Sequence, residues 1–90
     1  MAKTIAISLK DAEAFLKDHG RHYTAPAEPI CAIGLADGSV LHGAAILGRN
    51  AQGYGELAHI YVDGTWQGYS LLYGACWRAF HALGYSYIAL

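Results

Sequence analysis

Residues 56–90 read ELAHIYVDGTWQGYSLLYGACWRAFHALGYSYIAL, and this stretch decides the fold. The alternation from Glu56 to Val62 predicts a strand, and the turn after it leads into a helix that begins at Gln67 or Gly68 and ends at Leu83. Tyr85–Leu90 predicts a last strand. This part of the chain is therefore a strand, helix, strand unit, whose default geometry is a right-handed crossover between parallel strands.

The two faces of the Glu56–Val62 strand differ in character, and we expect the aliphatic face to be the core face. That face holds Glu56, Ala58, Ile60 and Val62, and the opposite face holds Leu57, His59 and Tyr61. In the helix, apolar residues recur at spacings of three and four, and Arg78 is the only formally charged side chain. This pattern predicts a helix that is buried on most of its circumference.

The N-terminal segment predicts a strand followed by an amphipathic helix. Thr4–Ile7 is short and partly β-branched, which favours a strand. Ser8 is suited to cap the helix, and Asp11 three residues later completes a start that resembles a capping box. Apolar residues recur at helical spacing after it, and Gly20 is suited to end the helix.

The middle of the chain predicts a loop and a hairpin. Residues 21–29 contain both prolines, which lack a backbone donor and push the preceding residue towards extended backbone, so we expect a loop there. Ile30–Ala36 and Val40–Leu47 flank Asp37-Gly38, a pair suited to the positive φ angles of a tight hairpin turn. A second loop, 48–55, follows. The sequence thus predicts one α/β (α+β) domain over residues 1–90, with the order β-α-β-β-β-α-β and a mixed sheet.

The composition predicts a packed core and excludes several classes of protein. Of the 90 residues, 54% are hydrophobic and 14% are charged, which argues against disorder. The net charge of −1 leaves no cluster of basic residues for non-specific binding to nucleic acid or anionic lipid. No segment approaches the roughly 20 apolar residues of a membrane span, so we expect a cytoplasmic protein. So much apolar content in so short a chain favours a homodimer.

The cysteines and histidines give no sign of a metal site. Cys31 and Cys76 each lie among apolar neighbours, which favours reduced core thiols, with a disulfide or a nucleophilic thiol as the alternatives. The five histidines include no helical pair at i, i+4 and no Cys-x-x-Cys companion. We therefore predict no metal site.

The turn between the strand and the apolar helix is the best candidate ligand site. A helix N-terminus presents unpaired backbone N–H groups and a partial positive charge, which together favour anions such as phosphate. Gly64 and Gly68 would let a ligand come close to the backbone. Two glycines are also common in turns that bind nothing, so their spacing alone does not distinguish a ligand site from an ordinary turn.

Beyond these patterns, the chain resembles the GNAT acetyltransferase superfamily, in the order of its elements and in several segments. More narrowly, it is similar to a phage-associated branch related to Mom-type DNA-modification enzymes. The resemblance covers Ile7 to Leu90, is most specific from Asp63 to Tyr85, and is carried by His22-Tyr23, the hairpin residues 33–49, Val62–Thr65 and Ser70–Arg78. It implies a GNAT-like sheet that stops after the last strand, earlier than in its relatives.

The resemblance implies N-acyl transfer from an acyl-CoA, with acetyl-CoA as the cofactor. The amides after Gly64 would hold the pyrophosphate, and the strand before them would align the thioester. The implied cofactor-binding residues are Ile60, Tyr61, Val62, Gly64, Thr65, Gln67, Gly68, Tyr69 and Ser70. The catalytic candidates are His22, Tyr23, Glu56 and His59, of which a His or Glu would accept the amine proton. For His22, Glu56 and His59, a residue without a catalytic role is the alternative.

Departures from the superfamily pattern favour a second function. Asp63 stands where the superfamily has Arg or Gln, and Trp66 stands where it has a glycine. A shortened relative of this kind would be a non-catalytic dimeric interaction module. Its homodimer would form at the sheet edge left open by Tyr85–Leu90.

Overall fold

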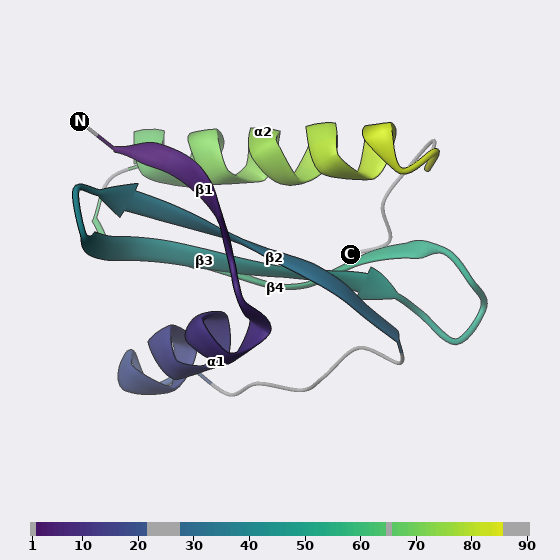
Figure 1. Cartoon of the computed structure of the whole chain (residues 1–90), viewed down its shortest axis with the longest axis horizontal. Helices are drawn as coiled ribbons and strands as arrows, with labels where there is room; N and C mark the ends of the chain where they lie inside the picture. The colour runs from purple at the N-terminus through teal and green to yellow at the C-terminus, as the bar shows by residue number, and fades with distance from the viewer. Residues whose placement is uncertain (1, 22–27, 65, 86–90) are drawn as a thin grey trace.

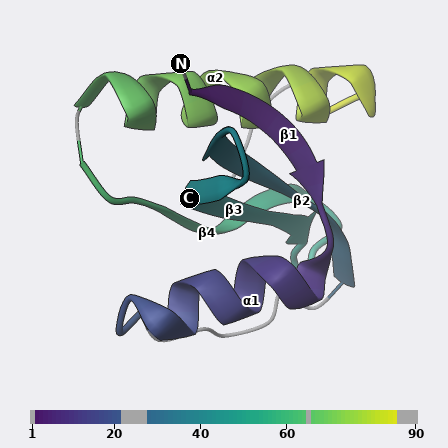
Figure 2. The same cartoon turned by 60° about the vertical axis from the view of Figure 1, so that its left-hand side comes forward.

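The computed structural model describes residues 2–21, 28–64 and 66–85. Their elements follow the order β1, α1, β2, β3, β4, α2, with the bounds Lys3–Ile7, Leu9–Asp18, Glu28–Asp37, Val40–Arg49, Gly55–Val62 and Trp66–Ala82. The sheet lies between α1 on one side and α2 on the other (Figure 1, Figure 2). The predicted α+β class is confirmed. The predicted last strand lies outside the described residues except for Tyr85, which is not in a strand.

The four described strands form one antiparallel sheet in the order β1-β2-β3-β4. β2 and β3 are the predicted hairpin, in which Asp37 pairs with Val40. Gly38 has a φ of 61° and no other described residue except glycine has a positive φ, so Gly38 alone supplies the left-handed backbone of the turn.

The strands of the hairpin are longer than predicted. β2 begins at Glu28, so the predicted loop through Pro29 is wrong. The register shifts between Pro29 and Cys31, and such an irregularity is one of the places where a strand accepts a residue without an N–H group. β3 continues to Arg49 and β4 starts at Gly55, which shortens the second loop to residues 50–54.

α1 begins and ends where the sequence predicts. The Ser8 hydroxyl oxygen accepts a hydrogen bond from the backbone N–H of Asp11 at 3.0 Å, which satisfies one of the donors that a helix start leaves unpaired. At the other end Gly20 has a φ of 69°, and Arg21 donates its N–H to the carbonyl oxygen of Leu16 at 2.9 Å. This Schellman-type ending fixes the direction in which the chain leaves the helix.

Two apolar clusters lie on opposite faces of the sheet, one under each helix. β3 contributes to both, because alternate side chains of a strand point to opposite faces. Ala44 and Ile46 belong to the α1 cluster, and Ala45 and Leu47 belong to the α2 cluster. The other buried members are Ala12, Phe15, Leu16 and Ala32 in the α1 cluster, and Leu57, Leu72, Cys76 and Phe80 in the α2 cluster.

The predicted division of β4 into one core face and one outer face is wrong, since both faces are covered. A bulge also interrupts the alternation. Ile46 pairs with His59 and Leu47 pairs with Leu57, which leaves Ala58 without a partner in β3. The alternation is therefore out of step across the bulge. Leu57, Ile60 and Val62 pack in the α2 cluster, and Ala58 and Tyr61 pack against the α1 cluster, so the predicted grouping of Ala58 with Ile60 and Val62 is wrong.

α2 has nearly the predicted bounds, and Gly84 follows it with a φ of 94°. The expectation that burial would extend around most of this helix is wrong. Its fully buried residues Leu72, Cys76 and Phe80 face the sheet, whereas Leu71, Tyr73 and Trp77 are exposed. A helix on the outside of a sheet buries only one stripe. Among the described residues, no helix is long and apolar enough to cross a membrane.

Both cysteines are free thiols, as predicted. Burial raises the pKa of Cys31, which is half-buried beside the α2 cluster. Burial, followed by the proximity of Cys31, raises the pKa of Cys76 to about 12. Because the thiolate is the reactive form, neither residue is poised as a nucleophile.

We expect iodoacetamide to leave Cys76 unmodified in the folded protein at pH 8. A pKa of about 12 keeps the thiol protonated at that pH, and the side chain is fully buried. Timed labelling followed by peptide mass spectrometry measures this, with the urea-unfolded protein as the control in which both cysteines react. Equal rates for Cys76 in the two states would contradict the expectation.

Candidate functional site

A pocket opens where the end of β4 meets the start of α2. Its volume is about 890 Å³, within the range of small-molecule sites. Val62 and Asp63 line it from the strand end, and Gly64, Gly68 and Ser70 line it from the turn and the first turns of α2. The pocket therefore coincides with the turn that the sequence indicates as a ligand site.

Positive charge lies on the α2 side of the pocket, while the carboxylates of Asp37 and Asp63 also line it. α2 has 17 residues and no acidic side chain in its first turn, so the partial positive charge of its N-terminus is not compensated there. Arg78, further along α2, also lines the pocket. At a rise of about 1.5 Å per residue, the ten residues from Gly68 to Arg78 span about 15 Å, so the pocket extends along the helix.

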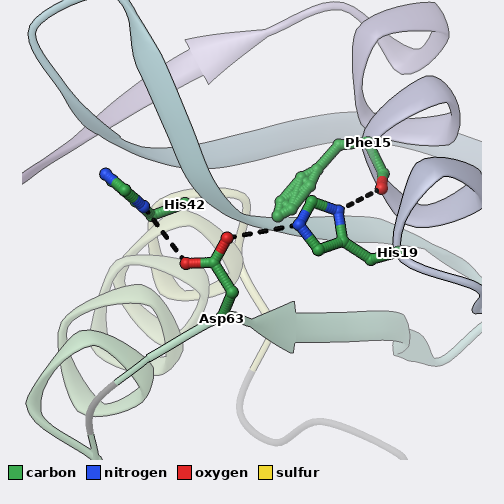
Figure 3. A network of polar contacts seen from close by, with 4 residues as sticks. All are labelled: Phe15, His19, His42 and Asp63. Atoms are coloured by element: carbon green, nitrogen blue, oxygen red, sulfur yellow. Dashed lines mark hydrogen bonds and ion pairs between the residues drawn. The ribbon is translucent and has the colours of Figure 1, made fainter.

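Asp63 joins two histidines that come from distant parts of the chain (Figure 3). Its Oδ1 lies 3.1 Å from Nδ1 of His42 in β3, and its Oδ2 lies 3.2 Å from Nε2 of His19, the residue that caps the end of α1. The backbone N–H of Asp63 also donates to the carbonyl oxygen of His42 at 2.9 Å. The side chain of Asp63 is 35% exposed, so solvent reaches a carboxylate that both rings hold in place.

His42 reaches the pocket from an irregular position in β3. The register between β2 and β3 skips it, because the paired residues of β3 on either side are Leu41 and Gly43. A bulge of this kind changes the direction in which a side chain points. His42 lines the pocket from this position. Since Nδ1 faces the Asp63 carboxylate, the neutral ring carries its proton on Nδ1 and keeps a lone pair on Nε2.

His19 is held at both ring nitrogens. Its Nδ1 lies 2.9 Å from the carbonyl oxygen of Phe15, while its Nε2 faces Asp63. Both partners are acceptors, so the protonated ring, with a donor on each nitrogen, satisfies both of them. The centroid of the His19 ring also lies 4.1 Å from that of Phe15 and 5.6 Å from that of Tyr61. His19 thus ties the end of α1 to the turn before α2.

Several of the cofactor-binding residues predicted from the sequence line the pocket, namely Val62, Gly64, Gly68 and Ser70. Ile60 packs against the α2 cluster and Tyr61 against the α1 cluster, and neither lines the pocket. Tyr69 is half-buried on α2. Thr65 and the side chain of Gln67 lie outside the described part of the chain.

The predicted catalytic residues that the structure describes do not line this pocket. Glu56 and His59 are half-buried in β4. His59 pairs with Ile46 of the α1 cluster, and cross-strand partners share a face of a sheet, so His59 lies on the α1 side. His22 and Tyr23 lie outside the described residues.

No sequence pattern predicts that His19, His42 and Asp63 come together. His42 lies near Asp63 because of the register between β3 and β4. The sequence of the loop at 50–54 does not reveal this register. His19 reaches Asp63 only because α1 packs across the sheet. The one available signal is that Asp63 directly follows a strand, where polar side chains often serve ligand sites.

The chemistry of the site is interpreted from its own residues, since comparisons with protein-family models, curated proteins and solved structures find no match to this chain. The site combines the start of α2, one guanidinium, the Asp37 carboxylate, and the Asp63 carboxylate held by two imidazoles. In the described ranges, no three His, Cys, Asp or Glu side chains are grouped as a metal ion requires. This combination suits an anionic small molecule and a proton transfer beside it.

Proposed function

We propose that this chain binds an acyl-CoA, with acetyl-CoA as the cofactor, and transfers the acyl group to an amine in the manner that the GNAT resemblance implies. The observation that carries the proposal is the pocket at the start of α2, whose lining includes Val62, Gly64, Gly68 and Ser70. The described elements from β1 to α2 follow the order β, α, β, β, β, α, which supports the proposal. The proposal includes a further strand within residues 86–90 and a cytoplasmic location.

Charge supports a diphosphate at this position. The N-terminus of α2 supplies backbone donors and a partial positive charge, and Arg78 adds a full positive charge along the same pocket. Both oxygens of Asp63 contact histidines, so its carboxylate is directed at those rings. The pocket therefore offers positive groups to an anion even though Asp63 stands where the superfamily has Arg or Gln.

The proposed reaction is a direct transfer. The amine nitrogen attacks the thioester carbonyl carbon, the C–N bond forms, and the C–S bond breaks. The nitrogen loses one proton to a base, and the sulfur leaves as the CoA thiolate, which takes up a proton to become the thiol. No covalent enzyme intermediate is needed, in agreement with the raised pKa values of Cys31 and Cys76.

We expect acetyl-CoA to bind and to raise the melting temperature, while S-acetylpantetheine, which lacks the nucleotide and its phosphates, does neither. A ligand at 100 times its Kd that binds only the folded state stabilises it by about 2.7 kcal/mol. Isothermal calorimetry and thermal unfolding measure the two effects. An unchanged melting temperature at millimolar acetyl-CoA would refute the proposal. Equal binding of both compounds would refute the diphosphate site.

A non-catalytic homodimeric interaction module is the second candidate function. The exposed apolar side chains of α2 favour it, because Leu71 is 49%, Tyr73 37% and Trp77 41% exposed. The homodimer edge predicted at Tyr85–Leu90 lies outside the described residues except for Tyr85. A stable dimer in sedimentation that does not respond to acetyl-CoA would select this function, and a monomer that binds acetyl-CoA would reject it.

A further inference from the structure

We infer that a second pocket, on the α1 side of the sheet, binds a small organic cation that carries an aliphatic chain. The volume of this pocket is about 440 Å³, within the range of small-molecule sites. α1 forms one wall, and β1, β2, β3 and the β2–β3 turn form the floor and the far end. Acyl transfer plays no part in this binding.

The second pocket and the first pocket, at the start of α2, lie on opposite faces of the sheet and share no lining residue. Leu35 and Asp37 line the first pocket, and Ala36 between them lines the second. Likewise, His42 lines the first pocket and its neighbour Leu41 lines the second. A ligand in the second pocket therefore contacts none of the residues assigned to the diphosphate.

The floor of the second pocket is apolar. Ile7 of β1 and Leu41 of β3 meet over Gly34 of β2, since an ideal Cβ on Gly34 would lie 3.0 Å from Cγ2 of Ile7 and 2.7 Å from Cδ1 of Leu41. Ile5 also lines the pocket and is 43% exposed, so α1 leaves part of this apolar surface in contact with water. Covering it with an aliphatic chain is favourable.

The wall that α1 contributes is acidic. Asp11 and Asp18 line the pocket from the same side of the helix, about 10 Å apart along its axis. No Lys or Arg lines the pocket, and among the described residues neither carboxylate forms an ion pair. Both ring nitrogens of His19, which also lines it, face acceptors elsewhere, namely Asp63 and the carbonyl oxygen of Phe15. The charge of the wall therefore favours a cation.

The wall and the floor together indicate the class of ligand. A cationic head group at the α1 carboxylates would place its aliphatic chain on the apolar floor. An alkylguanidinium suits this arrangement, because a guanidinium donates two parallel hydrogen bonds to one carboxylate. Binding should then depend both on the charge of the head group and on the length of the chain.

A titration of ¹⁵N-labelled protein with n-hexylguanidinium at low salt tests the site without any variant. We expect saturable amide shifts that are largest at Ala14, Ser39 and Leu41, with a Kd of about 1–10 mM. Ethylguanidinium should bind at least about tenfold more weakly, since each buried CH₂ group strengthens binding by about fourfold. 1-Hexanol, which lacks the charge, should bind about fivefold more weakly than hexylguanidinium.

Two outcomes of this titration would overturn the inference. Equal affinity for hexylguanidinium and ethylguanidinium would show that the apolar floor takes no part. Shifts that are largest at Gly64 and Gly68 would place the cation in the first pocket, beside Asp37 and Asp63.

Substitutions on α1 test the wall. Ala14 is exposed and lines the pocket, so Ala14→Trp should fill it and weaken hexylguanidinium binding by at least about tenfold. Glu13→Trp is the control, because Glu13 is exposed beside it and does not line the pocket. Equal weakening by the two variants would contradict the assigned position.

The cationic head group is tested by Asp18→Asn. This variant should weaken hexylguanidinium binding by about two- to fivefold at low salt and by less at high salt, as for an exposed ion pair. Glu13→Gln, which removes the same charge from the same helix outside the pocket, should keep the wild-type Kd. An Asp18→Asn variant with the wild-type Kd at low salt would overturn the assignment of the carboxylate wall.

Discussion

Replacing Phe80 with alanine is expected to lower the free energy of unfolding by about 3–5 kcal/mol. Phe80 is fully buried in the α2 cluster, and its ring centroid lies 5.6 Å from that of Tyr85 in an edge-on arrangement. An ideal Cβ on Gly55 would lie 3.0 Å from the Phe80 ring, so the ring fills the space beside this glycine of β4. The truncation leaves a cavity between α2 and the sheet.

Urea unfolding followed by circular dichroism measures this loss. Leu83→Ala is the matched control, because Leu83 comes just after the same helix and is 52% exposed. Its effect should stay within about 0.5 kcal/mol, as for most surface substitutions. A loss below about 1 kcal/mol for Phe80→Ala would contradict the account that the α2 cluster holds this helix on the sheet.

Reversing the charge of Arg78 is expected to weaken acetyl-CoA binding by at least about tenfold at low salt. Near water, a unit charge about 4 Å from a phosphate contributes about 1 kcal/mol, and Arg78→Glu replaces an attraction by a repulsion. Arg78 is exposed and lines the pocket, so the variant should fold. Calorimetry at two ionic strengths measures the effect, which should shrink as salt rises.

Lys10→Glu is the control for this experiment. Lys10 is exposed on α1, on the other side of the sheet from α2, and its replacement makes the same change of net charge (Figure 2). We expect this variant to bind acetyl-CoA like the wild type. Equal weakening by both variants would mean that Arg78 acts only through net charge and would remove it from the site.

Most of the elements follow from short-range patterns in the sequence. Ser8 and Gly20 mark the two ends of α1, because a cap hydroxyl and a left-handed glycine act within a few residues. The pair Asp37-Gly38 marks the hairpin for the same reason. The periodic spacing of apolar residues identified α2, although it could not reveal that only one side of the helix is covered.

What the sequence could not predict depends on long-range register. The bulges at Ala58 and His42 exist only relative to the neighbouring strands, so an alternation rule applied to one strand misses them. The same holds for the site. Gly64 and Gly68 could be predicted, because a strand, turn and helix are contiguous in sequence, whereas His19 and His42 reach Asp63 only through the tertiary fold.

The site that emerges has two halves that meet at Asp63. The start of α2 and Arg78 place positive charge at the pocket, and Asp63 contacts Nδ1 of His42 there. The first half was predicted from the sequence and the second was not. His42 and Asp63 line the same pocket as Gly64 and Gly68.

The most direct test of the cofactor site is a titration of ¹⁵N-labelled protein with acetyl-CoA, followed through its backbone amide resonances. The account predicts saturable shifts that are largest at Gly64, Gly68 and Ser70, together with a shift of the Arg78 side-chain resonance. Resonances of α1 residues such as Leu16 should move little. Unchanged amides from Gly64 to Ser70 at millimolar acetyl-CoA, or shifts confined to the α1 side of the sheet, would contradict it.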